Sequence, residues 1–263
     1  MSWYTHWFTD DMYIELYAHR DATEARLAID LFEKVTSLQP ETTSALPTPA
    51  APVTGTQSSF TGPLLDLACG SGRHAFELAR RGYTVIAADL SPTLLRVAAA
   101  KTQRYRHRVG LLRADMRRLP FTRSFSAVLQ LFTAFGYFRR DAENEAVING
   151  VRACLPSGAW YMLDFLNAEA VADMIVPYSE TQTSSGTVIQ ERSIRDGRVE
   201  KRIHIRENDQ EREFTESVRL FTCDDFARMF TRNAFQLAEV YGNYDGAAYE
   251  TDSPRCLMFA KAI

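Results

Sequence analysis

An apolar run that leads into a glycine-containing turn is the feature that most restricts how this chain can fold. The segment 63–68 is apolar apart from Asp66, which is typical of a short buried strand. Gly70 and Gly72 follow, and a helix pattern runs from Gly72 to Arg81. Glycine tolerates positive φ and lets a backbone approach a ligand closely. This order of strand, glycine turn and helix predicts the first unit of a ligand-binding α/β fold.

Strand-like and helix-like segments continue to alternate along the chain. We predict strands over residues 63–68, 83–88, 109–114, 124–131, 159–165, 235–241 and 255–262, with helices at 91 onward, 141–155 and 224–233. Ser91-Pro92 is a typical helix start, with serine as the N-cap and proline in the first turn. Such alternation favours a parallel sheet covered on both faces. We expect a doubly wound, Rossmann-like α/β fold with a seven-stranded, mostly parallel sheet.

The pattern changes after the fifth predicted strand. Segments 187–194, 198–206 and 212–221 alternate polar and apolar residues with a period of two, which is typical of half-buried strands. Asp196-Gly197 between the first two is a strong signal for a two-residue hairpin. We therefore predict a small antiparallel sheet inserted at about residues 177–222, with one charged face left for solvent or a partner.

The region before residue 63 divides into two parts. Apolar residues recur at helical spacing from Asp10 to Leu38, which predicts one helix. Residues 39–62 are rich in Pro, Thr, Ser and Ala without periodicity, which indicates a flexible linker. The aromatic, acidic start is unlike a signal peptide, and no stretch of about 18 apolar residues predicts a membrane span.

Charge and cysteine usage restrict the partners and the compartment. The formal net charge is −3 over 263 residues, so the whole chain is not expected to bind nucleic acid. The run from Arg96 to Arg118 is locally basic, which favours a solvated face over a polyanion groove. The four cysteines lie far apart, without zinc spacing, so we expect no metal, reduced thiols and a cytoplasmic location.

Three acids follow three successive predicted strands. Asp66 precedes the glycine turn, and Asp89 and Asp115 end the second and third strands. Their strands end at one edge of a parallel sheet, where ligands bind in this fold class. Each acid alone could instead cap a turn or helix. No third glycine completes a dinucleotide fingerprint, and the P-loop is absent. Acids in place of phosphate-binding features suit a cationic nucleoside, and S-adenosylmethionine has a sulfonium and an ammonium group.

These segments resemble the motifs of class I S-adenosylmethionine-dependent methyltransferases. The resemblance rests on Asp66–His74, Ala88–Ser91, Ala114–Met116, Ala127–Phe138 and Leu163–Asn167. The stretches Tyr241–Gly246 and Ser253–Arg255 are similar to the tail of a bacterial small-molecule subgroup that carries an antiparallel insertion after the fifth strand. The resemblance covers most of residues 63–263, the expected S-adenosylmethionine-binding domain, but identifies no methyl acceptor.

The resemblance implies a role for each matching position. The methionine part of the cofactor is expected beside Asp66, Ala68, Gly70 and Gly72, the ribose at Asp89 and Leu90, and the adenine at Asp115 and Met116. Gln130, Leu131 and Phe132 are expected near the sulfonium. In similar enzymes an aromatic N-terminal helix acts as a lid, which implies a lid over residues 1–38 with Tyr13, Tyr17 and Arg20 above the cofactor.

Methyl transfer from a sulfonium is an in-line displacement that depends mainly on positioning. Where the acceptor must lose a proton, the candidate bases are Tyr137, Asp164, His19 and His6. Arg255 is expected to pair with an acid across the sheet. We expect a methyltransferase acting on N or O of a small molecule. An RNA or protein methyltransferase and a non-catalytic S-adenosylmethionine-binding module remain alternatives, and the inserted sheet is a candidate homodimer surface.

Overall fold

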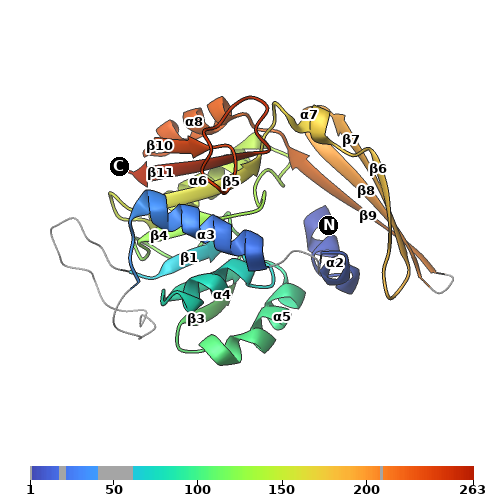
Figure 1. Ribbon diagram of the computed structural model, residues 1–263, viewed down its shortest axis with the longest axis horizontal. Coiled ribbons are helices and arrows are strands. Elements are labelled where there is room, and N and C mark those ends of the chain that lie inside the picture. Colours follow the sequence, from blue (N-terminus) through green and yellow to red (C-terminus); the bar gives the residue numbers. More distant parts are fainter. Residues whose placement is uncertain (1, 18–21, 41–61, 208–209) are drawn as a thin grey trace.

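The computed structural model describes residues 2–17, 22–40, 62–207 and 210–263 (Figure 1). A seven-stranded sheet forms its centre, in the order β10-β11-β5-β4-β1-β2-β3, and β11 runs antiparallel to both of its neighbours. The predicted fold class is therefore confirmed. The strands are β1 (Leu64–Leu67), β2 (Val85–Asp89), β3 (Val109–Arg113), β4 (Ala127–Gln130), β5 (Trp160–Leu166), β10 (Phe235–Tyr241) and β11 (Arg255–Ala262).

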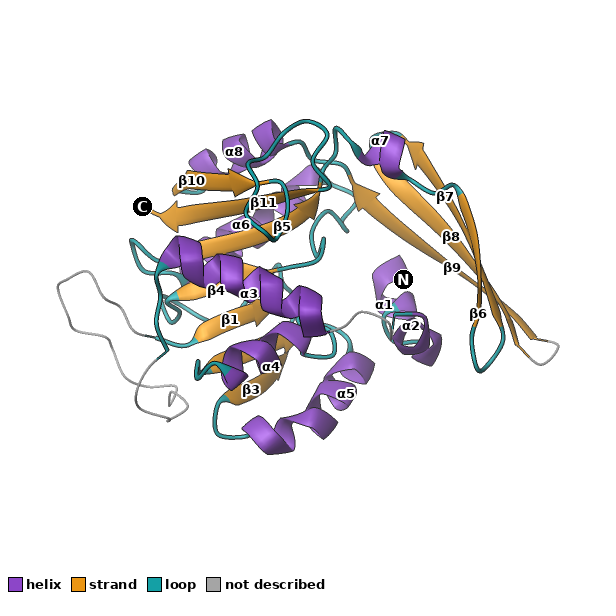
Figure 2. Ribbon diagram, in the orientation of Figure 1, coloured by secondary structure: helices purple, strands orange, loops and turns teal. Residues whose placement is uncertain are grey.

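Helices cover both faces of this sheet (Figure 2). One hydrophobic cluster joins the sheet to α6 (Asp141–Cys154) and α8 (Cys223–Arg232). The other joins it to α3 (Ala22–Thr36) and α4 (Arg73–Arg80). The helix α5 (Pro92–Thr102) connects β2 to β3, continues into the short 3-10 helix η1 (Gln103–Tyr105), and has Ser91 as its N-cap. Both faces of the central strands are therefore buried, as expected for a parallel sheet.

A second sheet, antiparallel throughout, lies between β5 and α8 in the chain. After the short helix α7 (Val171–Met174), it consists of β6 (Tyr178–Gln182), β7 (Thr187–Arg195), β8 (Arg198–Glu207) and β9 (Gln210–Arg219). The last three strands and the Asp196-Gly197 turn match the predicted insertion. β6 was not predicted, because its sequence YSETQ has no apolar alternation, and it forms the edge of the sheet beside β7.

The N-terminal region differs from the single helix predicted over residues 10–38. It begins with α1 (Trp3–Trp7), which the sequence did not suggest, and α2 (Asp11–Leu16) follows. Tyr17 leaves the helical conformation, with φ −104° and ψ 14°. The separate helix α3 buries Ala28, Ile29 and Phe32 in the core of the main sheet. Because α3 is part of that core, only α1 and α2 remain to form a cover.

The helices α1 and α2 fill the space between the two sheets (Figure 1). Trp7, Met12 and Leu16 pack on Val188, Ile203 and Ile205 of the second sheet. This contact buries the apolar face of the second sheet, whose strands alternate polar and apolar residues. The charged face of that sheet points away from α1 and α2. Throughout the described residues, no helix is long and apolar enough to cross a membrane.

Candidate functional site

The turn after β1 depends on glycine for two different reasons. Gly70 has φ +56°, and a Cβ built on it would meet nothing within 4 Å, so this backbone faces open space. Gly72 has φ +84°, and its Cβ would lie 2.7 Å from the Phe76 ring. Ala68 also has a positive φ of 58°, which is strained for a residue with a side chain. The turn is shaped to bring bare backbone to an open space.

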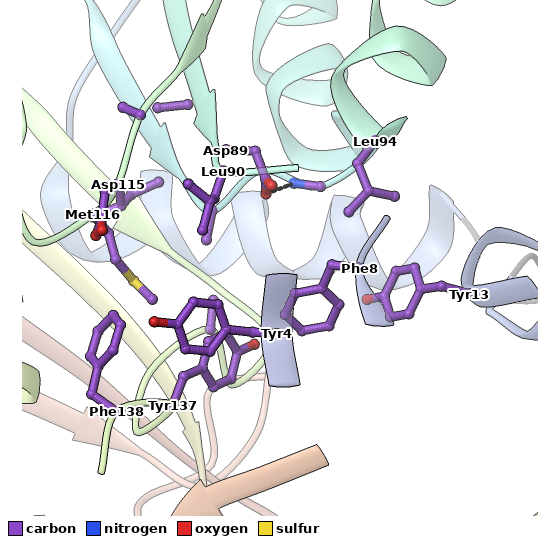
Figure 3. Close-up of a pocket in the computed structure, with 16 residues that line it drawn as sticks. Tyr4, Phe8, Tyr13, Asp89, Leu90, Leu94, Asp115, Met116, Tyr137 and Phe138 are labelled. Atoms are coloured by element: carbon purple, nitrogen blue, oxygen red, sulfur yellow. Dashed lines mark hydrogen bonds between the residues drawn. The ribbon is translucent and has the colours of Figure 1, made fainter. Parts of the chain in front are cut away.

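That space is a cavity of about 80 Å³ at the carboxyl ends of the first three strands (Figure 3). The residues around it come from the strand ends, from the loop after β4 and from the N-terminal helices. They are Tyr4, Phe8, Tyr13, Leu67, Ala68, Gly70, Ala88, Asp89, Leu90, Leu94, Ala114, Asp115, Met116, Ala134, Tyr137 and Phe138.

Asp66 lies beneath the turn and not in the cavity wall. It is 1% exposed, and its Oδ2 accepts a hydrogen bond from the Ala75 N–H at 3.0 Å, in the first turn of α4. Burial raises the pKa of this carboxyl to about 7, with a further contribution from the nearby charge of Asp89. This geometry matches the capping alternative for Asp66, so the acid supports the turn from below.

Asp89, by contrast, does line the cavity. Its Oδ2 accepts from the Gly70 N–H at 2.8 Å and its Oδ1 from the Ser91 N–H at 2.7 Å. Burial raises the pKa of this carboxyl, and the backbone N–H groups oppose the rise. A carboxylate has about four acceptor positions, so Asp89 retains capacity for hydroxyl donors from a ligand. Leu90 lies beside it in the wall (Figure 3).

Asp115 and Met116 face the same cavity from the end of β3. The side chain of Arg117 holds the Asp115 carboxylate through contacts of 2.6 to 3.2 Å and itself pairs with Glu143. The hydrogen bonds from Arg117 lower the pKa of Asp115. The structure therefore brings Asp89 and Asp115 together on one cavity wall, and the Met116 sulfur accepts from Gln130 Nε2 at 3.5 Å.

The segment after β4 contributes less side chain than expected. Gln130 is fully buried, accepts from the Tyr161 hydroxyl at 2.5 Å and donates to the Ala134 carbonyl. Leu131 packs in the core. Neither residue lines the cavity. Phe132 has a positive φ of 62°, and the guanidinium of Arg73 lies 4.9 Å from its ring centre.

Asp164 is already engaged by neighbouring donors. Its Oδ2 accepts from the Phe132 N–H at 2.6 Å and from the Tyr244 hydroxyl, while its Oδ1 accepts from Arg255 Nε at 2.8 Å. Arg255 also donates to the Thr133 hydroxyl. Because these donors occupy both of its oxygens, Asp164 fits a role in fixing the 132–133 turn. The expected structural pairing of Arg255 with an acid is present.

Aromatic side chains close the cavity opposite the acids. Tyr4 and Phe8 of the α1 region and Tyr13 of α2 lie beside Tyr137 and Phe138 in this part of the wall (Figure 3). The Phe8 and Tyr137 ring centres are 5.6 Å apart. Tyr137 is thus the one candidate base among the described residues that lines the cavity.

Of the other expected site residues, one lies away from the cavity and two are not described. The Tyr17 hydroxyl donates to Glu216 at 3.1 Å on the second sheet, away from the cavity wall. His19 and Arg20 fall outside the described residues. Tyr4 and Phe8 were missed, although the aromatic start of the sequence was a signal for them. Leu94 and Phe138 carry no local signal, because only the fold brings them to the cavity.

The residues present suit an adenosyl-sulfonium ligand. Gly70 offers bare backbone, Asp89 offers acceptors for a diol, and Asp115 offers acceptors for an amino group. Phosphate would meet two carboxylates on this wall, which is unfavourable. Within the described ranges, no group of three His, Cys, Asp or Glu side chains is placed to hold a metal ion.

Comparisons with known proteins also indicate a methyltransferase. Residues 64–158 match the family described as "Methyltransferase domain". The chain is 28% identical over 204 residues to the dTDP-3-amino-3,6-dideoxy-alpha-D-glucopyranose N,N-dimethyltransferase of Streptomyces fradiae, which covers 73% of this chain and 76% of that protein.

Two solved structures are similar across nearly the whole chain. A S-adenosylmethionine-dependent methyltransferase from Clostridium acetobutylicum ATCC 824 has a TM-score of 0.74 at 16% identity, covering 95% of this chain and 96% of that one. An amino pentose methyltransferase from Micromonospora echinaspora, involved in calicheamicin biosynthesis and solved with S-adenosylmethionine bound, has a TM-score of 0.63 at 23% identity, covering 97% and 98%. These likenesses show a shared fold.

Proposed function

Since this chain is a class I S-adenosylmethionine-dependent methyltransferase, we propose that it moves a methyl group to the amino nitrogen of a small sugar. The cofactor assignment rests on the cavity at the ends of β1, β2 and β3, whose wall contains Gly70, Asp89 and Asp115 (Figure 3). Transfer to N or O of a small molecule is supported by the relative from Streptomyces fradiae, whose named substrate is a small nucleotide sugar. The amino sugar is the finer proposal, supported by the named activity of the Streptomyces fradiae relative.

The proposed cofactor contacts follow the cavity wall. Gly70 and Ala68 hold the methionine part, Asp89 and Leu90 hold the ribose, and Met116 packs on the adenine ring. Asp115, held by Arg117, accepts from the adenine amino group. When bound, S-adenosylmethionine supplies a methyl group on a sulfonium that is already a good leaving group. The task of the protein is to align the acceptor with that methyl group and to exclude water.

Tyr137 is the proposed proton acceptor at the site. It lines the cavity beside Tyr4 and Phe8, between the cofactor side and the second sheet. A neutral amine attacks the methyl carbon directly and then carries an extra proton. The phenolate form of Tyr137 would remove that proton and become the neutral phenol. We do not assign Asp164 as the base, because its oxygens accept hydrogen bonds from Phe132, Tyr244 and Arg255.

A transfer assay tests the proposal. The purified chain is incubated with S-adenosylmethionine and either a dTDP-linked 3-amino-3,6-dideoxyglucose or its 3-hydroxy counterpart, and products are identified by mass spectrometry. We expect methylated amino sugar and no change in the hydroxy compound. Tyr137→Phe should lower kcat about 10-fold or more with little change in the KM for the cofactor. Absence of turnover with the amino sugar would contradict the substrate class.

The alternatives have less support in the structure. Much of the basic run is tied within the chain: Arg108 donates to the Gly82 carbonyl, Arg113 to the Leu90 carbonyl, and Arg117 pairs with Asp115. These contacts engage part of the positive charge that RNA binding would use. Turnover in the assay would exclude a purely binding module.

Two further expectations belong to the proposal. We place the protein in the cytoplasm, which suits its four free cysteines. We also propose that the outer face of the second sheet pairs two copies. Supporting features are its alternating charges and the exposed side chains of Met174, Val176 and Tyr178 at its edge. The pairing stays a prediction.

A further inference from the structure

The turn between α1 and α2 is fastened to the beginning of α5. The Ser91 hydroxyl donates to the Phe8 carbonyl at 2.5 Å, and the Thr93 hydroxyl donates to the Thr9 carbonyl at 3.1 Å. Both hydroxyl residues are buried, at 3% and 6% exposure. Carbonyls at the end of a helix lack partners within it, so these two bonds satisfy groups that would otherwise need water.

The same stretch also carries the proposed ribose acid. Asp89 Oδ1 accepts from the Ser91 N–H at 2.7 Å, and the Ser91 hydroxyl accepts from the Leu94 N–H as the helix cap. Ser91 thus contacts Asp89, the first turn of α5 and the N-terminal segment at once. Phe8, whose carbonyl it holds, also places its ring in the cavity wall (Figure 3).

From this geometry we propose that Ser91 and Thr93 are positioning residues that latch the N-terminal segment 3–17 over the cofactor. The inference rests on the proposed function, because it takes the cavity as the cofactor site. Tyr4, Phe8 and Tyr13 form the side of the cavity opposite the strand ends. A bound cofactor leaves when this segment lifts, and lifting breaks the two hydroxyl–carbonyl bonds. The latch therefore sets how fast the spent cofactor is released.

Thr93 gives the cleaner test, because Ser91 also caps α5. Thr93→Val keeps the shape of the side chain and removes its hydroxyl, and Thr93→Ser restores the hydroxyl. Thr102→Val is the matched control, since that hydroxyl donates to the Ala99 carbonyl of its own helix. Thr93→Ala replaces the valine variant where valine prevents folding.

Two measurements follow the opening of segment 3–17 and the release of the cofactor product separately. Hydrogen exchange on the protein without cofactor follows the amides of residues 3–17, and stopped-flow fluorescence follows the release of S-adenosylhomocysteine. For Thr93→Val we expect the exchange of residues 3–17 and the release of S-adenosylhomocysteine to be about five-fold faster, as for the loss of one hydrogen bond. The exchange rates of the amides of residues 85–89 should not change. Thr93→Ser and Thr102→Val should behave like the native chain.

Unchanged exchange of residues 3–17 in Thr93→Val, or equal acceleration in Thr102→Val, would overturn the latch. Accelerated exchange with unchanged release would show that the segment lifts without controlling the cofactor, which also overturns it. If S-adenosylhomocysteine does not bind the native chain, the proposed function fails, whereas the exchange measurement still decides whether the two hydroxyls hold the segment.

Discussion

Asp66 and Asp89 both lie at the end of a predicted strand, but the fold gives them different surroundings. Asp89 opens onto the cavity, whereas Asp66 is enclosed and accepts from the Ala75 N–H. Strand-end position alone could not separate them, because the direction of a side chain depends on the packing around it. Enclosure has a measurable effect, since burial raises the pKa of the Asp66 carboxyl to about 7.

A raised pKa in the folded state makes stability depend on pH. The folded protein binds the Asp66 proton more tightly than the unfolded chain, so this group favours folding at low pH. Its contribution is lost as pH rises from about 4 to about 7. Asp66→Asn keeps an acceptor for the Ala75 N–H and removes the titration. We expect the unfolding free energy of the variant, relative to native, to rise by roughly 2 kcal/mol between pH 5 and pH 7.

Urea unfolding of both proteins at several pH values measures this difference. Parallel stability curves for the native chain and Asp66→Asn would show that the carboxyl titrates normally. The sequence alone could place Asp66 at a strand end before the glycine turn, but could not give its pKa, because the burial arises from β1 and α4 together.

At the scale of elements, strands and helices with strong periodicity were predictable and the N-terminal helices were not. The main strands follow from short apolar runs, and Ser91-Pro92 marks the start of α5 correctly. The helix pattern over residues 10–38 continues past a real break at Tyr17. The apolar residues on either side pack against different sheets, α2 on the inserted one and α3 on the main one. Periodicity does not show which surface an element covers.

The link from α1 and α2 to the inserted sheet depends on Glu216 of β9. This carboxylate accepts from the Trp7 indole N–H at 2.6 Å and the Tyr17 hydroxyl, and pairs with Lys201 at 2.6 Å. Burial alone would raise its pKa, but the charge of Lys201 and these hydrogen bonds outweigh burial and lower it. The carboxylate therefore stays ionised while it holds both helices.

Glu216→Gln should weaken this link. The amide can replace only part of the hydrogen bonding and leaves Lys201 without its counter-charge, so we expect a loss of about 2 kcal/mol of unfolding free energy. Chemical denaturation measures the loss. Glu213→Gln is the control, since Glu213 lies on the same strand with an exposed side chain, and should change stability by less than about 0.5 kcal/mol. A similar loss in both variants would mean that Glu216 does not anchor the helices.

At the scale of the whole molecule, the two sheets and the helices between them create a site that no single segment contains. The sequence located its floor, because Gly70, Asp89 and Asp115 lie at predicted strand ends. On the opposite side it located Tyr13 and Tyr137 but missed Tyr4, Phe8 and Phe138, which reach the cavity through contacts between distant segments. The acceptor side depends on those same contacts, so the substrate class needed a comparison with a relative.

Calorimetric titration with S-adenosylhomocysteine tests most directly whether the cavity holds the adenosyl group. We expect the native chain to bind one equivalent, and Asp89→Asn to bind at least about 10-fold more weakly, because charged acceptors for the ribose hydroxyls are lost. Asp196→Asn, in the hairpin turn of the inserted sheet, should bind like the native chain. No heat from the native chain, or equal affinity for Asp89→Asn, would contradict the account.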